Sequence, residues 1–173
     1  MSLTFRAATE ADIPLLIDLV TGAYRGEASR AGWTTEADLL DGQRIDAEQL
    51  AADLARPQSV ILLGEQDGMP VACAHVAVEE GAGYFGMFSV RPLLQGHGLG
   101  KRMLAEAERI ARDDFGQKVM RMTVIDVRDE LIAYYERRGY HRTGIHKAFP
   151  YGDPRFGLPR RDDLRFEMLE KTL

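Results

Sequence analysis

A glycine-rich segment between an apolar run and an amphipathic helix constrains the fold of this chain more than any other feature. The apolar run is Tyr84–Val90, and Gln95-Gly96-His97-Gly98-Leu99-Gly100-Lys101 leads from it into a helix predicted over Gly98–Phe115. Glycines, which lack Cβ, expose backbone N–H groups where the helix dipole favours an anion. The segment therefore predicts a strand, a turn and a helix that together hold a phosphate or pyrophosphate group.

The spacing of this segment excludes two familiar phosphate loops. A Walker loop needs glycine at position 95 and serine or threonine at position 102, where the chain has Gln95 and Arg102. A dinucleotide-binding fingerprint that begins at Gly96 would need glycine where Lys101 stands. The predicted anion site is consequently of another type.

The rest of the chain alternates helical and extended patterns. A capping box at Thr9-Glu10-Ala11-Asp12 precedes a helical pattern that runs to Tyr24, and the pair Asp67-Gly68 predicts a hairpin turn. The other predicted elements are helices over Asp46–Arg56 and Asp129–Arg138 and strands over Ser59–Gly64, Pro70–Val78, Lys118–Ile125, Tyr140–Ile145 and Leu164–Met168. We expect a single domain over residues 1–173 with an α/β (α+β) fold, in which helices flank a mixed, largely antiparallel sheet.

Composition narrows the class of protein. The formal charge of -5 and the pI of about 5.4 lack the basic footprint of a nucleic-acid-binding protein. No apolar run reaches the roughly 18 residues that span a bilayer, and the N-terminus lacks the apolar core of a signal peptide. Cys73 is the only cysteine and the histidines lack the paired spacing of zinc sites, so we expect no disulfide and no metal. These features predict a cytoplasmic protein without nucleic-acid or membrane partners. They do not decide between a monomer and a homodimer.

A second motif lies in the predicted helix after Lys118–Ile125. Leu131-Ile132-Ala133-Tyr134-Tyr135-Glu136-Arg137-Arg138-Gly139-Tyr140 resembles a helix of the GNAT N-acetyltransferase superfamily, which ends in aromatic-Tyr-Glu-Lys/Arg-x-Gly-aromatic. The glycine-rich segment resembles the pyrophosphate loop of the same superfamily, Gln/Arg-x-x-Gly-x-Gly/Ala, at Gln95, Gly98 and Gly100. The resemblance is weak from Thr4 to Val78 and strong from Tyr84 to Tyr140. It implies the GNAT fold and an acetyltransferase that passes the acetyl group of acetyl-CoA to a primary amine of a small molecule, peptide or protein by direct attack.

The resemblance also implies roles for particular residues. The phosphates of CoA would bind the loop, at Gln95, Gly96, His97, Gly98, Leu99, Gly100 and Lys101. The pantetheine arm would bond to the backbone of Phe88, Ser89 and Val90, where the strand splays from its neighbour, and an N–H near Phe88 would stabilise the oxyanion. Tyr135 would protonate the departing thiolate, although helical periodicity alone favours a packing role beside Tyr134. Arg128 stands where many members carry a cofactor-binding asparagine, and it either binds CoA by charge or faces solvent.

The base and the acceptor are not assigned by the sequence. Tyr84–Val90 contains no Glu or Asp where some family members place a base, so water or one of Glu27, His75, Glu79, Asp126 and His146 remains open. Trp33, Tyr151 and Phe156 either line an acceptor pocket or anchor loops. A cationic amine is favoured as the acceptor by four acidic residues, Glu27, Asp38, Asp41 and Asp46, unless these are only solvated charges on a loop. Three arginines in the same segment would instead bind a carboxylate group of the acceptor: Arg25, Arg30 and Arg44. The alternative function is an acyl-CoA-binding sensor without catalysis, because a protein can keep the fold and the cofactor cleft after it has lost the catalytic activity.

Overall fold

The structure, a computed structural model, describes residues 3–24, 40–41, 46–91, 94, 98–148, 158–159 and 164–173. Its sheet is formed by β1 (Leu3–Ala7), β3 (Ser59–Gln66), β4 (Met69–Glu79), β5 (Ala82–Val90), β6 (Val119–Ile125), β7 (His141–Ala148) and β9 (Arg165–Thr172). Its helices are η1 (Glu10–Asp12), α1 (Ile13–Tyr24), α3 (Ala47–Ala55), α4 (Leu99–Arg109), the π-helical η3 (Ile110–Asp114) and α5 (Asp129–Arg137). Two short strands, β2 (Leu40–Asp41) and β8 (Leu158–Pro159), pair with each other. No helix within these ranges is both long and apolar enough to cross a membrane.

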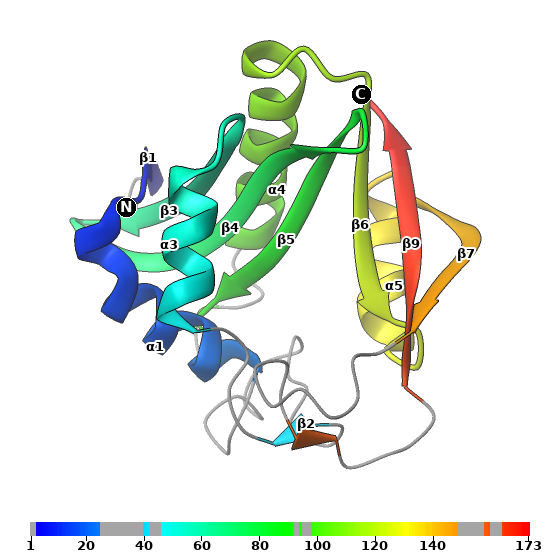
Figure 1. The fold of residues 1–173 in the computed structure, drawn as a ribbon, viewed down its shortest axis with the longest axis horizontal. Helices are drawn as coiled ribbons and strands as arrows, with labels where there is room; N and C mark the ends of the chain where they lie inside the picture. Colours follow the sequence, from blue (N-terminus) through cyan, green and yellow to red (C-terminus); the bar gives the residue numbers. More distant parts are fainter. Residues whose placement is uncertain are drawn as a thin grey trace.

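The seven strands of the sheet follow the order β1-β3-β4-β5-β6-β9-β7 (Figure 1). Every neighbouring pair is antiparallel except β5 and β6, which are parallel and are connected through α4. The predicted mixed, largely antiparallel sheet is therefore confirmed. Although β7 follows β6 and α5 along the chain, β9 lies between β6 and β7 in the sheet.

Local sequence signals explain the N-terminal half of the fold. Thr9 N donates to Asp12 Oδ2 at 2.8 Å and completes the predicted capping box before α1. Asp46 caps α3, since its Oδ1 accepts a hydrogen bond from Gln49 N at 2.8 Å. The turn between β3 and β4 has Asp67 at φ 52° and Gly68 at φ 78°, the left-handed conformations of a type I′ hairpin turn.

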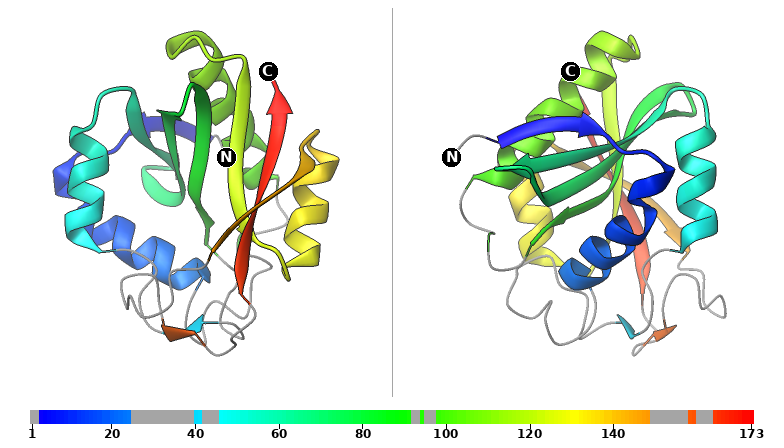
Figure 2. Two further views of the ribbon diagram at one scale, coloured as in Figure 1. Left: turned by 45° about the vertical axis from the view of Figure 1, so that its right-hand side comes forward. Right: turned by 90° about the vertical axis from the view of Figure 1, so that its left-hand side faces the viewer.

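Helices cover both faces of the sheet. Helices α1 and α3 share one cluster of buried residues with β3 and β4, among them Leu16, Leu50 and Ile61. Helices α4 and α5 lie on the opposite face (Figure 2), where Met103 and Ile132 belong to the larger cluster. Because an apolar stripe on each helix faces the sheet, the chain buries a core on both sides of β4 and β5.

Among the elements that depart from the sequence expectations are α4 and β9. The predicted helix over Gly98–Phe115 is α-helical only from Leu99 to Arg109 and continues as the π-helical turn η3. The alternation in Leu164–Met168 places Glu167 on the face opposite Phe166, yet Glu167 is only 3% exposed while Phe166 is partly exposed. Arg142 Nη2 lies 2.5 Å from Glu167 Oε1 and neutralises the carboxylate, which lets it occupy a buried position.

Candidate active site

The parallel strands β5 and β6 pair over a short stretch and then separate. Their register consists of Gly83 opposite Met120 and Tyr84 opposite Arg121, and we call these two residue pairs the seam. On its other edge, β5 stays paired with β4 as far as Val90, which lies opposite Ala72. Figure 1 shows β5 and β6 diverging toward their C-terminal ends. The predicted splay between these strands is thus present, and residues 85–90 lie beside it.

A β-bulge interrupts β5 beside the splay. His75 lies opposite Gly86 and Cys73 opposite Ser89, so Met87 and Phe88 together face the single residue of β4 between them. Met87 has φ 53°, an uncommon conformation for a residue with a side chain. The bulge sends Met87 into the α1/α3 cluster and Phe88 into the α4/α5 cluster. It therefore reorients the backbone of β5 at Phe88, near which the resemblance implies an N–H that stabilises the oxyanion.

Residues 88–90 themselves are buried in the strand. Phe88 and Val90 are core residues, and Ser89 is fully buried. Ser89 Oγ donates to Met87 O at 3.2 Å and so bonds to the bulge of its own strand. The sequence gives no sign of this contact, because it depends on how β5 pairs with β4.

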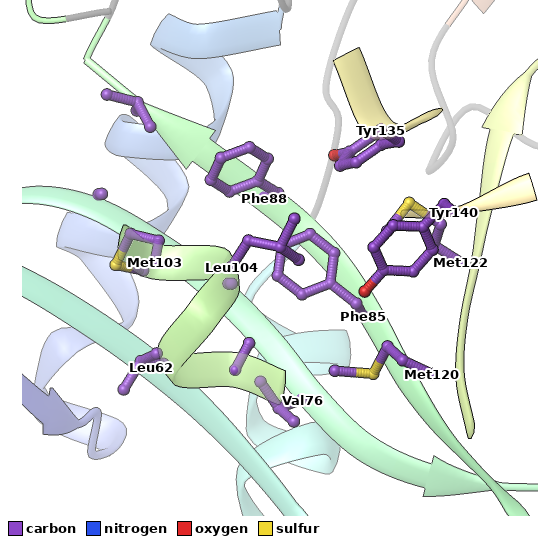
Figure 3. Packing of buried hydrophobic residues seen from close by; sticks show 14 of the residues in the cluster. Leu62, Val76, Phe85, Phe88, Met103, Leu104, Met120, Met122, Tyr135 and Tyr140 are labelled. Atoms are coloured by element: carbon purple, nitrogen blue, oxygen red, sulfur yellow. The ribbon is translucent and has the colours of Figure 1, made fainter. Parts of the chain in front are cut away.

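Tyr135 reaches the same bulge from the opposite side of the splay. It lies on α5, is 3% exposed, and packs its ring 6.5 Å from that of Phe88 and 6.4 Å from that of Phe85. Tyr140 completes the aromatic cluster at 6.0 Å. In Figure 3 the hydroxyl of Tyr135 points toward the side on which Phe88 lies. Tyr135 is thus a packed aromatic residue next to the predicted reaction centre, and its role as an acid stays a prediction.

The N-terminus of α4 begins at Gly98, which adopts φ 78° with no side-chain cap. No acidic residue occurs in the first helical turn, and Lys101 in that turn is exposed. Helix N-terminal N–H groups without acidic neighbours favour a bound anion. Gln95, Gly96 and His97 lie outside the described residues. Leu99 packs its side chain in the core at 4% exposure, so only its backbone can serve a cofactor.

The two glycines of this turn are needed for different reasons. Among the described residues other than its neighbours in the chain, no atom lies within 4 Å of the place where a Cβ of Gly98 would stand, but its positive φ disfavours any other residue. At Gly100 a Cβ would lie 2.9 Å from Phe88 Cζ and 3.1 Å from the Tyr134 hydroxyl oxygen. Gly98 therefore allows the turn, and Gly100 allows β5 and α5 to approach α4.

Arg128 lies at the N-terminal boundary of α5, after the end of β6. Its backbone N donates to Ile125 O at 3.1 Å, and its O accepts from Ile132 N at 3.1 Å. The side chain makes no capping hydrogen bond to the helix. This position is compatible with either expectation for Arg128, and a contact with CoA stays a prediction.

His75, one of the base candidates, is part of a buried network on the α3 side of the sheet. Its Nε2 lies 2.7 Å from Ser59 Oγ, which donates its own proton to Asp53 O at 2.8 Å. The Asp53 carboxylate lies 3.9 Å from His75 Nδ1. Burial, followed by the charge of Arg56, lowers the pKa of His75 to about 4, so the ring is neutral at pH 7. These contacts tie β4 to β3 and α3.

The other base candidates contact charged side chains or lie outside the described residues. Glu79 Oε1 lies 3.2 Å from Arg56 Nη1 on the surface. Asp126 Oδ2 lies 2.5 Å from Arg165 Nε, and His146 Nε2 lies 3.4 Å from Glu167 Oε1. Glu27 falls outside the described residues. The base therefore remains unassigned.

The features expected to bind the acceptor are mostly not described. Trp33, Tyr151, Phe156, Glu27, Asp38, Arg25, Arg30 and Arg44 all lie outside the described residues. Asp46, which belongs to the expected acidic group, instead caps α3 through its hydrogen bond from Gln49 N. In the described part of the chain, no three His, Cys, Asp or Glu side chains are grouped closely enough to hold a metal ion.

Comparison with known proteins adds a family and a fold. Residues 23–140 match the sequence profile of the acetyltransferase (GNAT) family. No curated protein sequence matches the chain. Among solved structures, the ribosomal-protein-alanine N-acetyltransferase of Brucella melitensis is 21% identical with a TM-score of 0.71, covering 98% of this chain and 99% of that one.

Two further structures were solved with acetyl-CoA or coenzyme A. The Salmonella typhimurium protein yncA, solved with its cofactor acetyl-CoA, is 19% identical with a TM-score of 0.71 and coverage of 100% and 95%. The PaiA N-acetyltransferase of Thermoplasma acidophilum, solved with coenzyme A, is 17% identical with a TM-score of 0.69, covering all of both chains (100% each). At these identities the likeness establishes a common fold.

Proposed function

Because the chain belongs to the GNAT acetyltransferase family, we propose that it transfers the acetyl group of acetyl-CoA to a primary amine. The observation that carries the proposal is the convergence of three features at the splay. These are the bulge at Met87 and Phe88, the N-terminus of α4 at Gly98, and Tyr135 on α5. The proposal assigns residues 1–173 to one acetyltransferase domain.

Acetyl-CoA would lie on the α4/α5 side of β5. Backbone N–H groups from Gly98 to Lys101 would bind its phosphates, with the charge of Lys101 and the helix dipole adding attraction. The pantetheine arm would follow the backbone of residues 88–90, since an amide-containing chain can pair with a strand much as β6 does at the seam. Gln95, Gly96 and His97 would complete the phosphate loop, and Arg128 would approach from α5.

The reaction would proceed by direct attack. The amine nitrogen bonds to the thioester carbonyl carbon, and the negative charge moves to the carbonyl oxygen, where a backbone N–H at the bulge stabilises it. When the carbon–sulfur bond breaks, the thiolate takes a proton from Tyr135. The nitrogen loses its proton to water or to a base on the acceptor side. The products are the N-acetylated amine and CoA with a free thiol.

The family and the fold do not specify the acceptor. The solved structures include one named a ribosomal-protein-alanine N-acetyltransferase and one named PaiA N-acetyltransferase. Proteins that share this fold are therefore named as different N-acetyltransferases. Within the proposal, a small amine or an exposed peptide amine is the acceptor class. The acidic residues expected to attract a cationic amine are now fewer, because Asp46 has a structural role in capping α3.

The test measures CoA binding and thiol release with the same protein. Calorimetry gives the affinity for CoA, and a thiol-reactive dye follows release from acetyl-CoA with a panel of amines, amino acids and peptides. The proposal expects binding and amine-dependent release with at least one acceptor class. Binding without release across the whole panel favours a non-catalytic acyl-CoA sensor, and absence of binding contradicts both functions.

A further inference from the structure

Two buried side chains hold the carbonyl oxygen of Met87 in the bulge of β5. Ser89 Oγ donates to Met87 O at 3.2 Å, and Cys73 Sγ donates to the same oxygen at 3.8 Å. Both donors belong to residues with 0% exposure. Because Ser89 is on β5 and Cys73 is on β4, the peptide group between Met87 and Phe88 is held from two strands.

The faces of the sheet give the direction of this peptide group. Cys73 belongs to the α1/α3 cluster, and Ser89 lies directly opposite Cys73, so both side chains are on the α1/α3 side. Met87 O therefore points toward that side. The oxygen and the hydrogen of a trans peptide group point in opposite directions. The N–H of Phe88 consequently points toward the α4/α5 side of β5, where the proposed function places acetyl-CoA.

The conformation at Met87 depends on support from its surroundings. Met87 has φ 53°, and an uncommon backbone conformation persists where the structure around it holds it in place. The side chains on either side of the peptide group are anchored separately, Met87 in the α1/α3 cluster and Phe88 in the α4/α5 cluster. Packing thus fixes the two Cα atoms, whereas the peptide group can turn about the line that joins them. The contacts of Ser89 and Cys73 restrain this rotation.

We propose that Ser89 and Cys73 are positioning residues for acetyl transfer, which hold the Met87 carbonyl so that the N–H of the same peptide group faces the thioester oxygen. The inference rests on the proposed function, in which a backbone N–H at the bulge stabilises the oxyanion. Neither side chain touches acetyl-CoA, since both lie on the opposite side of β5. Their effect on the rate comes from orientation, because a donor stabilises the developing charge only when it is aimed at it.

Ser89→Ala removes the stronger of the two donors. We expect kcat and kcat/KM for acetyl-CoA to fall together by about 10- to 100-fold, because the lost interaction forms in the transition state. The KM for acetyl-CoA and the calorimetric affinity for CoA should change by less than about twofold. Turnover is measured with the most active acceptor of the amine panel.

Cys73 allows the donor to be removed or kept at one position. Cys73→Ala removes it and should lower kcat by about two- to fivefold, since a thiol is a weak donor. Cys73→Ser keeps a donor to Met87 O and should retain most of the turnover. A loss in Cys73→Ser as large as in Cys73→Ala would attribute the effect to packing and contradict the role of Cys73.

Thr143 provides a control for the loss of a hydroxyl. Its Oγ1 donates to Met168 O at 2.8 Å, so it also bonds a backbone carbonyl of the sheet, but in the C-terminal strands β7 and β9. Thr143→Val should leave kcat within about twofold of the parent value. Urea unfolding of every variant shows which substitutions change only the stability.

The remaining outcomes separate this inference from the proposed function. A Ser89→Ala variant that is less stable but has an unchanged kcat would mean that Ser89 only supports the fold, and a higher KM at unchanged kcat would mean a role in binding. Either result overturns the inference. If Ser89→Ala does not fold, Cys73→Ala and Cys73→Ser still decide. An unsubstituted protein without transferase activity would instead contradict the proposed function, and the inference would fall with it.

Discussion

The sheet consists of two halves that differ in how closely they are packed. In the N-terminal half, β1, β3, β4 and β5, the strand β4 is buried without interruption from Val71 to Ala77, with helices on both faces. In the C-terminal half, β6, β9 and β7, every residue of β7 except Thr143 is exposed. In the described sheet, the strands of the two halves pair with each other only along the seam between β5 and β6.

The candidate site lies at the boundary between these two halves, beside the bulge of β5. Beyond the seam, the contacts of Tyr135 with Phe85 and Phe88 connect the halves by side-chain packing. A ligand that enters the splay would therefore meet the edge of β5 on one side and Tyr135 of α5 on the other. Substitutions at the boundary test how far the two halves act together.

The largest effect is expected at Tyr135, the side chain through which the C-terminal half reaches the bulge of β5. Tyr135→Phe keeps the aromatic contacts and removes the proposed proton donor, so turnover should fall roughly 10²- to 10⁴-fold while CoA affinity is retained. Steady-state kinetics and calorimetry check the two parts. Near-normal turnover would leave Tyr135 a purely packing residue that joins the halves.

A substitution of Gly98, at the start of α4, tests the helix terminus beside the bulge of β5. Gly98→Val imposes a β-branched side chain at φ 78° and should weaken CoA binding by roughly 1 to 3 kcal/mol, through strain in the turn that presents the helix N–H groups. Calorimetry with CoA measures the change, and circular dichroism checks the fold. Unchanged affinity in a folded variant would remove the α4 terminus from the proposed site.

Gly83 tests the seam itself. A Cβ at this position would lie 3.0 Å from Ala111 Cβ and 3.1 Å from Val119 O, which is backbone and cannot turn aside. Gly83→Val should therefore lower the free energy of unfolding by about 1 to 3 kcal/mol. Urea denaturation measures it.

Gly22 provides the control for this substitution. Gly22 lies in α1, and in the described part of the chain no atom outside its own helix lies within 4 Å of the place where a Cβ would stand. Gly22→Ala should therefore stabilise the protein by about 0.5 to 1 kcal/mol. If Gly83→Val were as stable as the parent protein, the seam would have to be looser than its two residue pairs suggest.

The last prediction concerns pH and the N-terminal half alone. The pKa of His75 is lowered from 6.5 to about 4 in the folded protein, so the unfolded chain binds more protons between these values. The stability contribution is complete above pH 6.5 and declines as the pH falls toward 4. Between pH 7 and pH 5.5 the loss should be about 1 kcal/mol. Urea unfolding of the parent and of His75→Gln measures it, and an equal pH dependence in both would rule out His75 as its source.

The sequence predicts features that depend on nearby residues. The cap at Asp46 and the hairpin turn at Asp67 and Gly68 are set within a few residues, and all three are present. The bulge at Met87 was not predicted, because an apolar run has the same pattern with or without an extra residue, and only pairing with β4 reveals it. The burial of Glu167 was missed for a similar reason, since its partner Arg142 is on another strand.

The candidate site divides in the same way. The motifs indicate Gly98 and Tyr135, and the structure brings the α4 terminus and Tyr135 to the same bulge. The contact of Tyr134 with Gly100 joins two helices, and no periodicity in either helix encodes it. The base could not be predicted, because the position of a titratable side chain relative to the splay depends on the whole fold.

The close approach at Gly100 also limits the order in which this protein can evolve. The space that its missing side chain leaves is used by Phe88 from β5 and Tyr134 from α5. An alanine at position 100 would therefore require Phe88 and Tyr134 to shift or to be replaced by smaller side chains. Changes at positions 88, 100 and 134 should thus be historically contingent on one another, although the three positions lie in separate parts of the sequence.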